Sequence, residues 1–360
     1  MVKIFLSVSQ IYYSAATLTG VHRTGGTGYI GGDVLSAIVE AHPDYEITCL
    51  ARNAEKAGLL NSRYPFLSTI VGDLDDSHLL AEQAVKADIV CHLANCEHPG
   101  AVQAISKGFS QLDASSPAKA FIHLSGSDIL CFEDLDNSTY GTKSNKFYDD
   151  MQGVDEVLDI PKDAPHQSVD SVVTQLGSKN KVVKTAIVCP PAIYGTGRGP
   201  GNKRSIQVPE LVSHTLKRGA GFRVGQGENR WATVNIQDLA QLFLKLVEDA
   251  ASGTWKGTWG RYGFYFAGSG LASWGDVSAQ IAQEAVTQGF LKSGKVDSLS
   301  WEEADKVWEY SSIFLGTNSL CKSLRAKEVL GWVPEGRSLG EEIRDLINQE
   351  ATSLGLARIH

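Results

Sequence analysis

The sequence predicts an α/β protein built on a doubly wound parallel β-sheet with helices on both faces. Two observations lead to this prediction. Short apolar segments alternate with amphipathic segments through the first half of the chain, and a glycine-rich turn stands just before the first expected helix. Segments that are apolar at every position are typical of strands buried on both faces, which is the situation of strands in a parallel sheet.

The expected elements follow in order along the chain. Strands are expected at residues 2–6, 46–50, 69–71, 88–93, 121–124 and 182–189, with helices at 32–41 and 79–85. After Pro190 and Pro191 the chain becomes richer in glycine, arginine and aromatic residues. Helices are expected there at 208–217, 236–250, 273–286, 301–309 and 339–353, with a strand at 264–266. This second half is expected to form a smaller, mixed α/β subdomain.

The composition argues against several classes of function. The net charge is −8 and no basic cluster stands out, so nucleic acid is not an expected partner. No apolar run approaches the roughly 18 residues of a membrane span, so no membrane contact is expected. The cysteines lack the spacing of a disulfide framework or a zinc site, and no metal is expected. Cys49, Cys91 and Cys189 lie inside apolar strands, as reduced thiols do, which indicates a cytoplasmic protein.

The first residues weakly resemble a secretory signal, because Lys3 precedes an apolar run and small residues follow at 14–16. Cleavage there would remove the strand that must lead into the glycine turn. The two interpretations therefore exclude each other, and the glycine turn is the stronger pattern.

The glycine-rich turn has the spacing of a dinucleotide-binding loop. Gly25, Gly28 and Gly31 form the pattern G-x-x-G-x-x-G. Glycines let the backbone approach a pyrophosphate closely, and the helix that follows points its free amides at the anion. A turn without a ligand is the alternative, but a helix follows at once, as in a Rossmann-type domain. The cofactor-binding residues expected here are Gly25, Thr27, Gly28, Tyr29, Ile30 and Gly31.

Two later positions bear on the choice of dinucleotide. Asp73 and Leu74 close the third expected strand, where an acidic side chain can reach an adenine amino group. At the end of the second strand, NAD-binding domains carry an acidic residue for the ribose hydroxyls, whereas this chain has Arg52. A guanidinium forms a charge-assisted fork on a 2′-phosphate, so NADP is preferred to NAD. The alternative is that Arg52 is a solvated loop cation.

Six segments form a recognisable series of motifs. They are T-G-G-T-G-Y-I-G at 24–31, D-I-V-C-H-L-A-N at 88–95, F-I-H-L-S-G-S at 121–127, P-P-A-I-Y-G at 190–195, T-V-N-I-Q-D-L-A at 233–240 and L-G-W-V-P at 330–334. In this order they make the chain resemble the extended short-chain dehydrogenase/reductases of the NAD-dependent epimerase/dehydratase type. The resemblance implies a Rossmann-type fold in which Leu93, Ala94, Pro190 and Ile193 contact the cofactor.

The catalytic pair that the resemblance implies is absent. Family members use a Tyr and, four residues later on the same helix face, a Lys that lowers the pKa of the Tyr. Here Tyr140 is followed at that spacing by Ser144, and Tyr148 by Gln152. The usual proton-transfer group is therefore missing or replaced.

A His–Asp pair in place of Tyr–Lys is one interpretation. The helix expected before the sixth strand carries His166 and Asp170 at the i and i+4 positions. A histidine exchanges a proton near neutral pH, and a nearby carboxylate raises its pKa and orients the ring. The alternatives are that the pair is lost and His166 only caps or packs this helix, or that Tyr148 supplies the acid.

The resemblance also implies positions for the substrate. Ser127, two residues beyond the first serine of the fifth strand, aligns with the active-site serine, and Ser125 is the alternate. Both are ordinary turn serines if the catalytic pair is lost. Tyr194 and Arg198 lie in a loop that faces substrate in the family, where an arginine pairs with a phosphate or carboxylate. A solvated loop is the alternative for Arg198.

These expectations combine into one organisation of the chain. A dinucleotide-binding domain is expected at residues 1–190, with an atypical insertion at 7–23, and a substrate-binding subdomain at 191–360, from which 233–262 returns to the first domain. The expected function is that of an NAD(P)-dependent oxidoreductase or epimerase-like enzyme with an altered active site, acting on a small hydroxy- or carbonyl-containing substrate. The alternative is a non-catalytic, dinucleotide-binding regulator or sensor. Family members often form homodimers, and the resemblance extends that expectation to this chain.

The insertion at residues 7–23 separates the first strand from the glycine turn that it should enter directly. It is rich in Ser, Thr and Tyr and shows no helical period. We expect either a surface bulge or a retained intron, since Val8-Ser9 can be encoded by the splice-donor-like sequence GTAAGT. Peptide mapping of the native protein decides between them. Under the intron hypothesis no peptide from residues 7–23 is found, and detection of one would exclude that hypothesis.

Overall fold

A computed structural model describes residues 1–8 and 27–359, and a seven-stranded parallel sheet is the largest element of this part. The strand order is β11-β7-β5-β4-β1-β2-β3. The strands are β1 (Lys3–Val8), β2 (Glu46–Ala51), β3 (Ser68–Val71), β4 (Ile89–Leu93), β5 (Lys119–Leu124), β7 (Val183–Cys189) and β11 (Phe264–Phe266). Because the order reverses beside β1, the sheet is doubly wound in the Rossmann manner, and the predicted fold class is confirmed.

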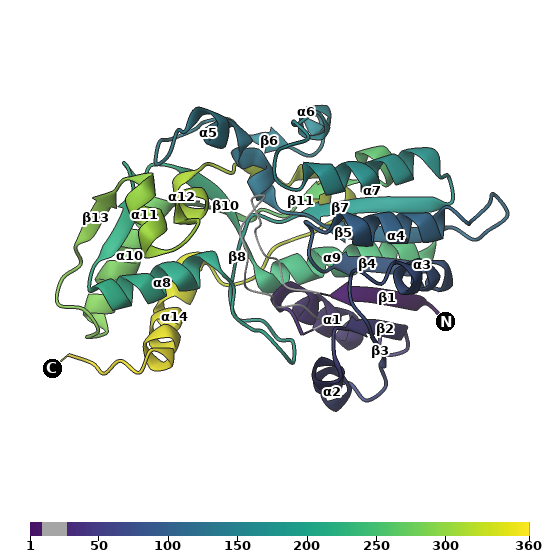
Figure 1. Cartoon of the computed structure of the whole chain (residues 1–360), viewed down its shortest axis with the longest axis horizontal. Helices are drawn as coiled ribbons and strands as arrows, with labels where there is room; N and C mark the ends of the chain where they lie inside the picture. Colours follow the sequence, from purple (N-terminus) through teal and green to yellow (C-terminus); the bar gives the residue numbers. More distant parts are fainter. Residues whose placement is uncertain (9–26, 360) are drawn as a thin grey trace.

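Helices cover both faces of this sheet, and the side-chain alternation of the strands divides the core accordingly. On one face lie α1 (Tyr29–Ala41), α2 (Ala54–Arg63) and α9 (Ile236–Ser252), and on the other α3 (Ser77–Lys86), α4 (Pro99–Phe109) and α7 (Gln167–Lys179). Ile4 and Leu6 of β1 pack toward α1 and α9, whereas Phe5 between them packs toward the α3 side. Figure 1 shows these layers at the right of the molecule.

The same alternation directs two imidazoles toward α7. In β4 and β5, the residues Val90 and Phe121 belong to the core on the α7 side. His92 and His123 lie two positions further along the same strands and are paired across them. Since side chains two residues apart share a face, both rings point toward α7, and both are fully buried.

A smaller lobe lies at the left of Figure 1. Its strands are β8 (Ala192–Tyr194), β9 (Gly221–Val224), β10 (Arg230–Asn235), β12 (Gly270–Ser273) and β13 (Val296–Leu299), and its helices are α5 (Phe132–Asn137), α8 (Gln207–Arg218), α10 (Trp274–Thr287), α11 (Trp301–Val307), α12 (Ser311–Gly316) and α14 (Leu339–Ser353). Trp231, Trp274 and Phe222 are at the centre of its core. The short strands β6 (Tyr148–Asp149) and β14 (Cys321–Lys322) pair with each other, and together with α6 (Val154–Leu158) and α13 (Leu324–Leu330) they pack on the large sheet.

Several boundaries differ from those expected. β1 continues through Val8, two residues into the expected insertion, and residues 9–23 and Gly25 lie outside the described residues. The strand at 264–266 forms as β11, but it pairs with β7 in the large sheet. The segment that returns from the smaller lobe therefore continues past residue 262.

Two whole-chain expectations can be compared with the described residues. All six cysteines lie among them, and each is buried and free of a disulfide. No helix in the described ranges has the length and apolar character needed to cross a bilayer.

Close packing of α7 onto the sheet gives a test of the fold. A Cβ at Gly177 would lie 2.1 Å from Thr185 Oγ1 and 2.8 Å from the Gly260 Cα. We therefore expect Gly177→Ala to lower the free energy of unfolding by about 1–3 kcal/mol, measured by urea denaturation. The control is Gly58→Ala in α2, where no atom lies within 4 Å of the added carbon. That change should raise stability by about 0.5–1 kcal/mol, and equal shifts in the two variants would contradict the described packing.

Candidate functional site

A cavity lies at the carboxyl ends of β5 and β7, beside the start of α1. It encloses about 680 Å³ of empty space, part of it open to solvent. Open α/β sheets bind their ligands at this edge. The wall contains Tyr29, Ile30, Ser125, Gly126, Ser127, Asp128, Pro190, Pro191, Ile193, Arg204, Ser205, Ile206, Gln207, Trp231 and Phe314. Six predicted site residues thus come together here, namely Tyr29, Ile30, Ser125, Ser127, Pro190 and Ile193.

The start of α1 lies beside this cavity. Gly28 is the N-cap, with φ −73° and ψ 163°, and no side chain among the described residues caps the helix. No acidic residue lies in the first turn. Unpaired amides at the positive end of a helix dipole bind anions, so the donors present here fit the pyrophosphate of a dinucleotide.

The loop after β8 packs tightly onto α1. A Cβ on Gly199 would lie 2.6 Å from the Gly32 Cα, so the two backbones are in contact. Arg198 donates to Asp33 through both its backbone amide and its guanidinium, at 2.7 Å in each case, and also pairs with Glu40 at 3.2 Å. Arg198 was expected to face substrate, but it fastens its own loop to α1. The physical reason is that the carboxylate of Asp33 is fully buried and requires a countercharge.

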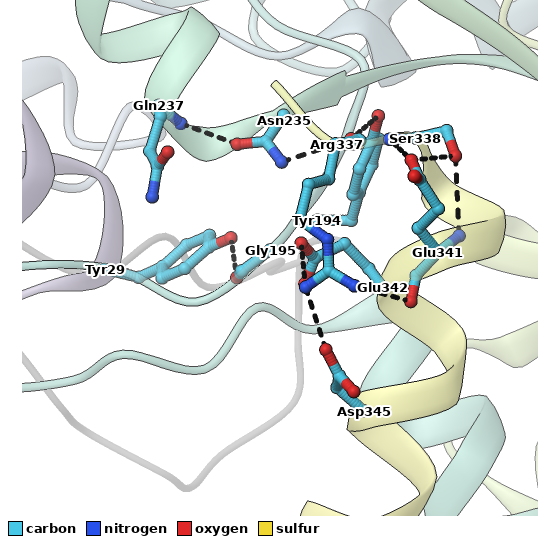
Figure 2. A network of polar contacts seen from close by, with 10 residues as sticks. All are labelled: Tyr29, Tyr194, Gly195, Asn235, Gln237, Arg337, Ser338, Glu341, Glu342 and Asp345. Atoms are coloured by element: carbon cyan, nitrogen blue, oxygen red, sulfur yellow. Dashed lines mark hydrogen bonds and ion pairs between the residues drawn. The ribbon is translucent and has the colours of Figure 1, made fainter.

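A polar network connects α1 with α14 (Figure 2). The hydroxyl of Tyr29 donates to the Gly195 carbonyl at 2.7 Å. Tyr194, expected to face substrate, donates instead to the Arg337 carbonyl at 3.0 Å, and it lines a neighbouring cavity. Asn235 caps α9 and also reaches the Arg337 carbonyl, at 3.4 Å. The network holds the cavity wall to the smaller lobe, and the side chain of Tyr194 is committed to it.

The expected adenine-side residues lie at the ends of β2, β3 and β4. Arg52 directly follows β2 and is partly exposed. Asp73 is exposed and accepts the backbone amides of Asp75 and Asp76 at 2.9 and 3.2 Å, which makes a tight turn. Further residues near these ends, all buried, are Leu74, Leu93 and Ala94.

His166 has different partners from those expected. It precedes α7 as the N-cap residue, with a left-handed φ of 64°. Its Nε2 lies 2.6 Å from Asp128 Oδ1, its backbone amide donates to Glu97 at 2.9 Å, and its Nδ1 pairs with the same carboxylate. The expected His166–Asp170 side-chain pair is thus replaced by contacts with Asp128 and Glu97. The i, i+4 rule predicted the wrong partner because it applies to residues within a helix. His166 lies just before α7, and its left-handed backbone turns the ring toward the end of β5.

Charge and close packing both fix the ring of His166. Burial lowers the pKa of His166, but Asp128 and Cys96 raise it more, so the net pKa lies well above its usual value. A Cβ on Gly126 would lie 2.6 Å from Asp128 Oδ1 and 2.7 Å from His166 Nε2. Asp128 lies in the cavity wall, so His166 is connected to the cavity through this carboxylate.

One group among the described residues brings together donors suited to a metal ion. Cys96, Glu97 and His166 have donor atoms within 4.8 Å of one another. Both ring nitrogens of His166 already face carboxylates, those of Glu97 and Asp128. Hydrogen bonds and charge pairing therefore account for this cluster, and no metal is assigned to it.

Asp170 belongs to a second cluster. Its Oδ2 accepts the hydroxyl of Ser125 at 2.6 Å, and its Oδ1 lies 3.3 Å from His123 Nε2. The Nδ1 atoms of His123 and His92 are 3.0 Å apart. The sequence interpretation missed both histidines, although an imidazole at one position of an otherwise apolar strand was a visible signal. It also missed Asp128, which carried no pattern of its own.

The remaining two candidates, Ser127 and Tyr148, each form a hydrogen bond with another side chain. The hydroxyls of Ser127 and Ser319 are 2.6 Å apart. Tyr148, the alternative acid, donates to Glu133 at 3.3 Å, and it is absent from the residues that line the cavity. Ser127 therefore keeps a hydroxyl at the cavity, whereas Tyr148 does not.

Comparisons with known proteins agree with this geometry. The model of the NAD dependent epimerase/dehydratase family matches residues 24–117. The chain is 36% identical over 346 residues to the oxidase ucsJ of an Acremonium species, covering 94% of this chain and 99% of that one. It is also 28% identical to an uncharacterized protein of Saccharomyces cerevisiae, over 90% of this chain and 97% of the other.

Solved structures show the same fold. The dTDP-glucose 4,6-dehydratase DesIV of Streptomyces venezuelae, solved as a double mutant with NAD bound, superposes with a TM-score of 0.63 at 15% identity, covering 99% of this chain and 98% of that one. The UDP-glucose 4-epimerase of Thermotoga maritima, solved with UDP-glucose, gives a TM-score of 0.62 at 13% identity, covering 98% and 99%.

The Asp128–His166 pair predicts a pH dependence of stability. Because the pKa of His166 is raised on folding, its contribution is fully present below the unfolded value of about 6.5 and is lost as the pH rises through the raised folded value. We expect Asp128→Asn to reduce this contribution. The difference in unfolding free energy between wild type and variant should therefore be largest near pH 6 and shrink at alkaline pH, as measured by urea denaturation.

A surface pair provides the control for this measurement. His42 pairs with Glu248 at 2.9 Å, and the side chain of Glu248 is 44% exposed. Glu248→Gln should change stability by no more than about 1 kcal/mol at any pH. A difference for Asp128→Asn that stays constant across the pH range would contradict the charged state assigned to His166.

Proposed function

Because the chain belongs to the NAD-dependent epimerase/dehydratase family, we propose that it is an NAD(P)-dependent oxidoreductase acting on a small hydroxy- or carbonyl-containing molecule. The observation that carries the proposal is the cavity, where the amide-rich start of α1 faces the polar turn after β5. A nicotinamide dinucleotide, when bound, supplies or accepts a hydride.

The residues proposed to hold the cofactor are arranged along the dinucleotide from its adenosine end to its nicotinamide end. Backbone amides at the start of α1 take the pyrophosphate, the turn after β7 takes the nicotinamide end, and the ends of β2 and β3 take the adenosine end. The full set is Gly25, Thr27, Gly28, Tyr29, Ile30, Gly31, Arg52, Asp73, Leu74, Leu93, Ala94, Pro190 and Ile193. Arg52 is partly exposed, so its guanidinium can bind a 2′-phosphate. NADP is therefore the preferred cofactor.

Two hydrogen-bonded pairs, His166 with Asp128 and Asp170 with Ser125, are proposed to handle protons in place of the Tyr and Lys of the family. His166 acts on the cavity through Asp128, and Asp170 acts through Ser125. The Ser127 hydroxyl, also in the wall, binds the substrate oxygen. Each assigned role rests on a side chain that reaches the cavity directly or through one hydrogen-bonded neighbour.

The rest of the wall favours an uncharged substrate. Trp231, Phe314 and Ile206 present apolar surface, which gains free energy when it is covered. Arg204 is the wall's cation, but Glu350 accepts from it at 2.6 Å and Glu210 at 2.7 Å, so its charge is already balanced. We therefore propose a small neutral carbonyl compound or alcohol rather than a phosphorylated sugar.

A fluorescence titration with NADPH and, separately, with NADH tests the cofactor assignment. We expect tighter binding of NADPH, because Arg52 adds charge-assisted hydrogen bonds to the 2′-phosphate. Arg52→Ala should lose about 10–100-fold in NADPH affinity and little in NADH affinity. The matched control is Arg63→Ala, which removes an exposed arginine at the end of α2 and should leave both affinities unchanged.

The same preparation separates the enzyme from a non-catalytic sensor. Consumption of bound NADPH with a panel of small aldehydes and ketones would support the oxidoreductase. Tight binding without turnover of any panel member would favour the alternative, a dinucleotide-binding regulator. No binding of either nucleotide would contradict both.

A further inference from the structure

Four buried side chains form a continuous series from the cavity wall into the sheet. Ser125 Oγ donates to Asp170 Oδ2 at 2.6 Å, and Asp170 Oδ1 lies 3.3 Å from His123 Nε2. His123 Nδ1 in turn lies 3.0 Å from His92 Nδ1. All four residues are at most 2% exposed, and Ser125 is the member that lies in the cavity wall.

The hydrogen-bonding needs of these groups favour one arrangement of protons. Asp170 Oδ1 and His123 Nε2 have no other hydrogen-bond partner among the described residues, so a proton on Nε2 satisfies both. A neutral imidazole carries one N–H, which leaves His123 Nδ1 as an acceptor. His92 must then carry its own proton on Nδ1. Burial is the main cause that lowers the pKa of His92 well below its usual value, so this ring stays neutral.

We propose that Asp170 exchanges the proton of the bound substrate through the Ser125 hydroxyl, and that His123 and His92 are positioning residues for its carboxylate. This inference rests on the proposed function and names the group that replaces the tyrosine of the family. Because the carboxylate contacts are hydroxyl and imidazole donors, Asp170 is held as a proton acceptor.

The transfer is balanced in both directions. When an alcohol is oxidised, its O–H bond breaks as Ser125 Oγ takes the proton, and the proton of Ser125 moves to Asp170 Oδ2. The electron pair of the broken bond remains on the substrate oxygen and forms the carbonyl as the hydride leaves for the oxidised dinucleotide. In the reducing direction the same proton returns from Asp170 to the substrate oxygen through Ser125.

His166 is less suited to accept this proton. Its two ring nitrogens face the carboxylates of Asp128 and Glu97, so both act as donors. Other titratable groups that face the series are Glu97 toward His123, Cys189 toward Asp170 and His98 toward His92. Among the described residues, Asp170 is the carboxylate that accepts a hydrogen bond from a hydroxyl of the cavity wall, that of Ser125, which can pass on a proton.

Nitrogen-15 NMR of histidine-labelled, full-length protein tests the arrangement without a substrate. We expect His123 as the Nε2–H tautomer and His92 as the Nδ1–H tautomer in the wild type. In Asp170→Asn the preference of His123 for Nε2–H should fall about 10–100-fold, because a hydrogen bond to a charged acceptor is lost, and His92 should change with it. The exposed control Asp163→Asn should leave both tautomers unchanged.

A second variant and a rate measurement complete the test. Ser125→Ala removes the link to the cavity and should keep both tautomers, so it serves if Asp170→Asn does not fold. With a substrate from the panel, Ser125→Ala and Asp170→Asn should each lose about 10²–10⁴-fold in turnover, whereas Asp163→Asn should not. His92 as the Nε2–H tautomer, or full turnover in Ser125→Ala, would overturn the inference. If the wild type shows the expected tautomers and binds dinucleotide but turns over no panel member, the proposed function is contradicted instead.

Discussion

The parallel register of β1, β4, β5 and β7 is the constraint on which the site depends. Because these strands run in one direction, their carboxyl ends meet at one edge of the sheet, and the turns that follow β5 and β7 line one cavity there. A slip of one residue would move each side chain to the opposite face. His92 and His123 would then point toward α1 and α9, far from α7. The chemistry proposed for the cavity therefore depends first on the register of the strands and only then on the loops.

Three buried carboxylates lie near that edge, and each has its own partners. Asp33 is paired with Arg198, Asp128 with His166, and Asp170 with two donors. Removing charges from water is costly, and good geometry recovers only part of that cost. A fold selected for stability alone would favour apolar residues at these positions. Their grouping at the edge of the sheet where ligands bind is what a site that handles protons and anions requires.

Much of the fold could be predicted because its signals are local. The helix expected at 339–353 forms as α14 with those bounds, and the strand expected at 182–189 forms as β7, one residue shorter. Apolar periodicity is a property of neighbouring residues, so a short window of sequence carries it. The glycine pattern is local in the same way, and it placed the start of α1 beside the cavity.

The partners at the site could not be predicted because they come from distant parts of the chain. Asp128 lies 38 positions from His166, and Asp33 lies 165 positions from Arg198. No spacing rule links residues so far apart. The i, i+4 rule also assumed that His166 was helical, whereas its left-handed backbone places it just outside α7. Sequence therefore identified the residue types, and the tertiary fold decided which of them meet.

Gly126 has a consequence for how the Asp128–His166 pair arose. No side chain fits at that position beside the Asp128–His166 pair, since even a methyl group would collide with both. An ancestor with a larger residue there could not have acquired the pair in one substitution. Glycine had to come first or arrive together with the histidine and the aspartate. Among relatives of this chain, the three residues should therefore be inherited as a unit, and their joint presence would mark the lineage in which this pair formed.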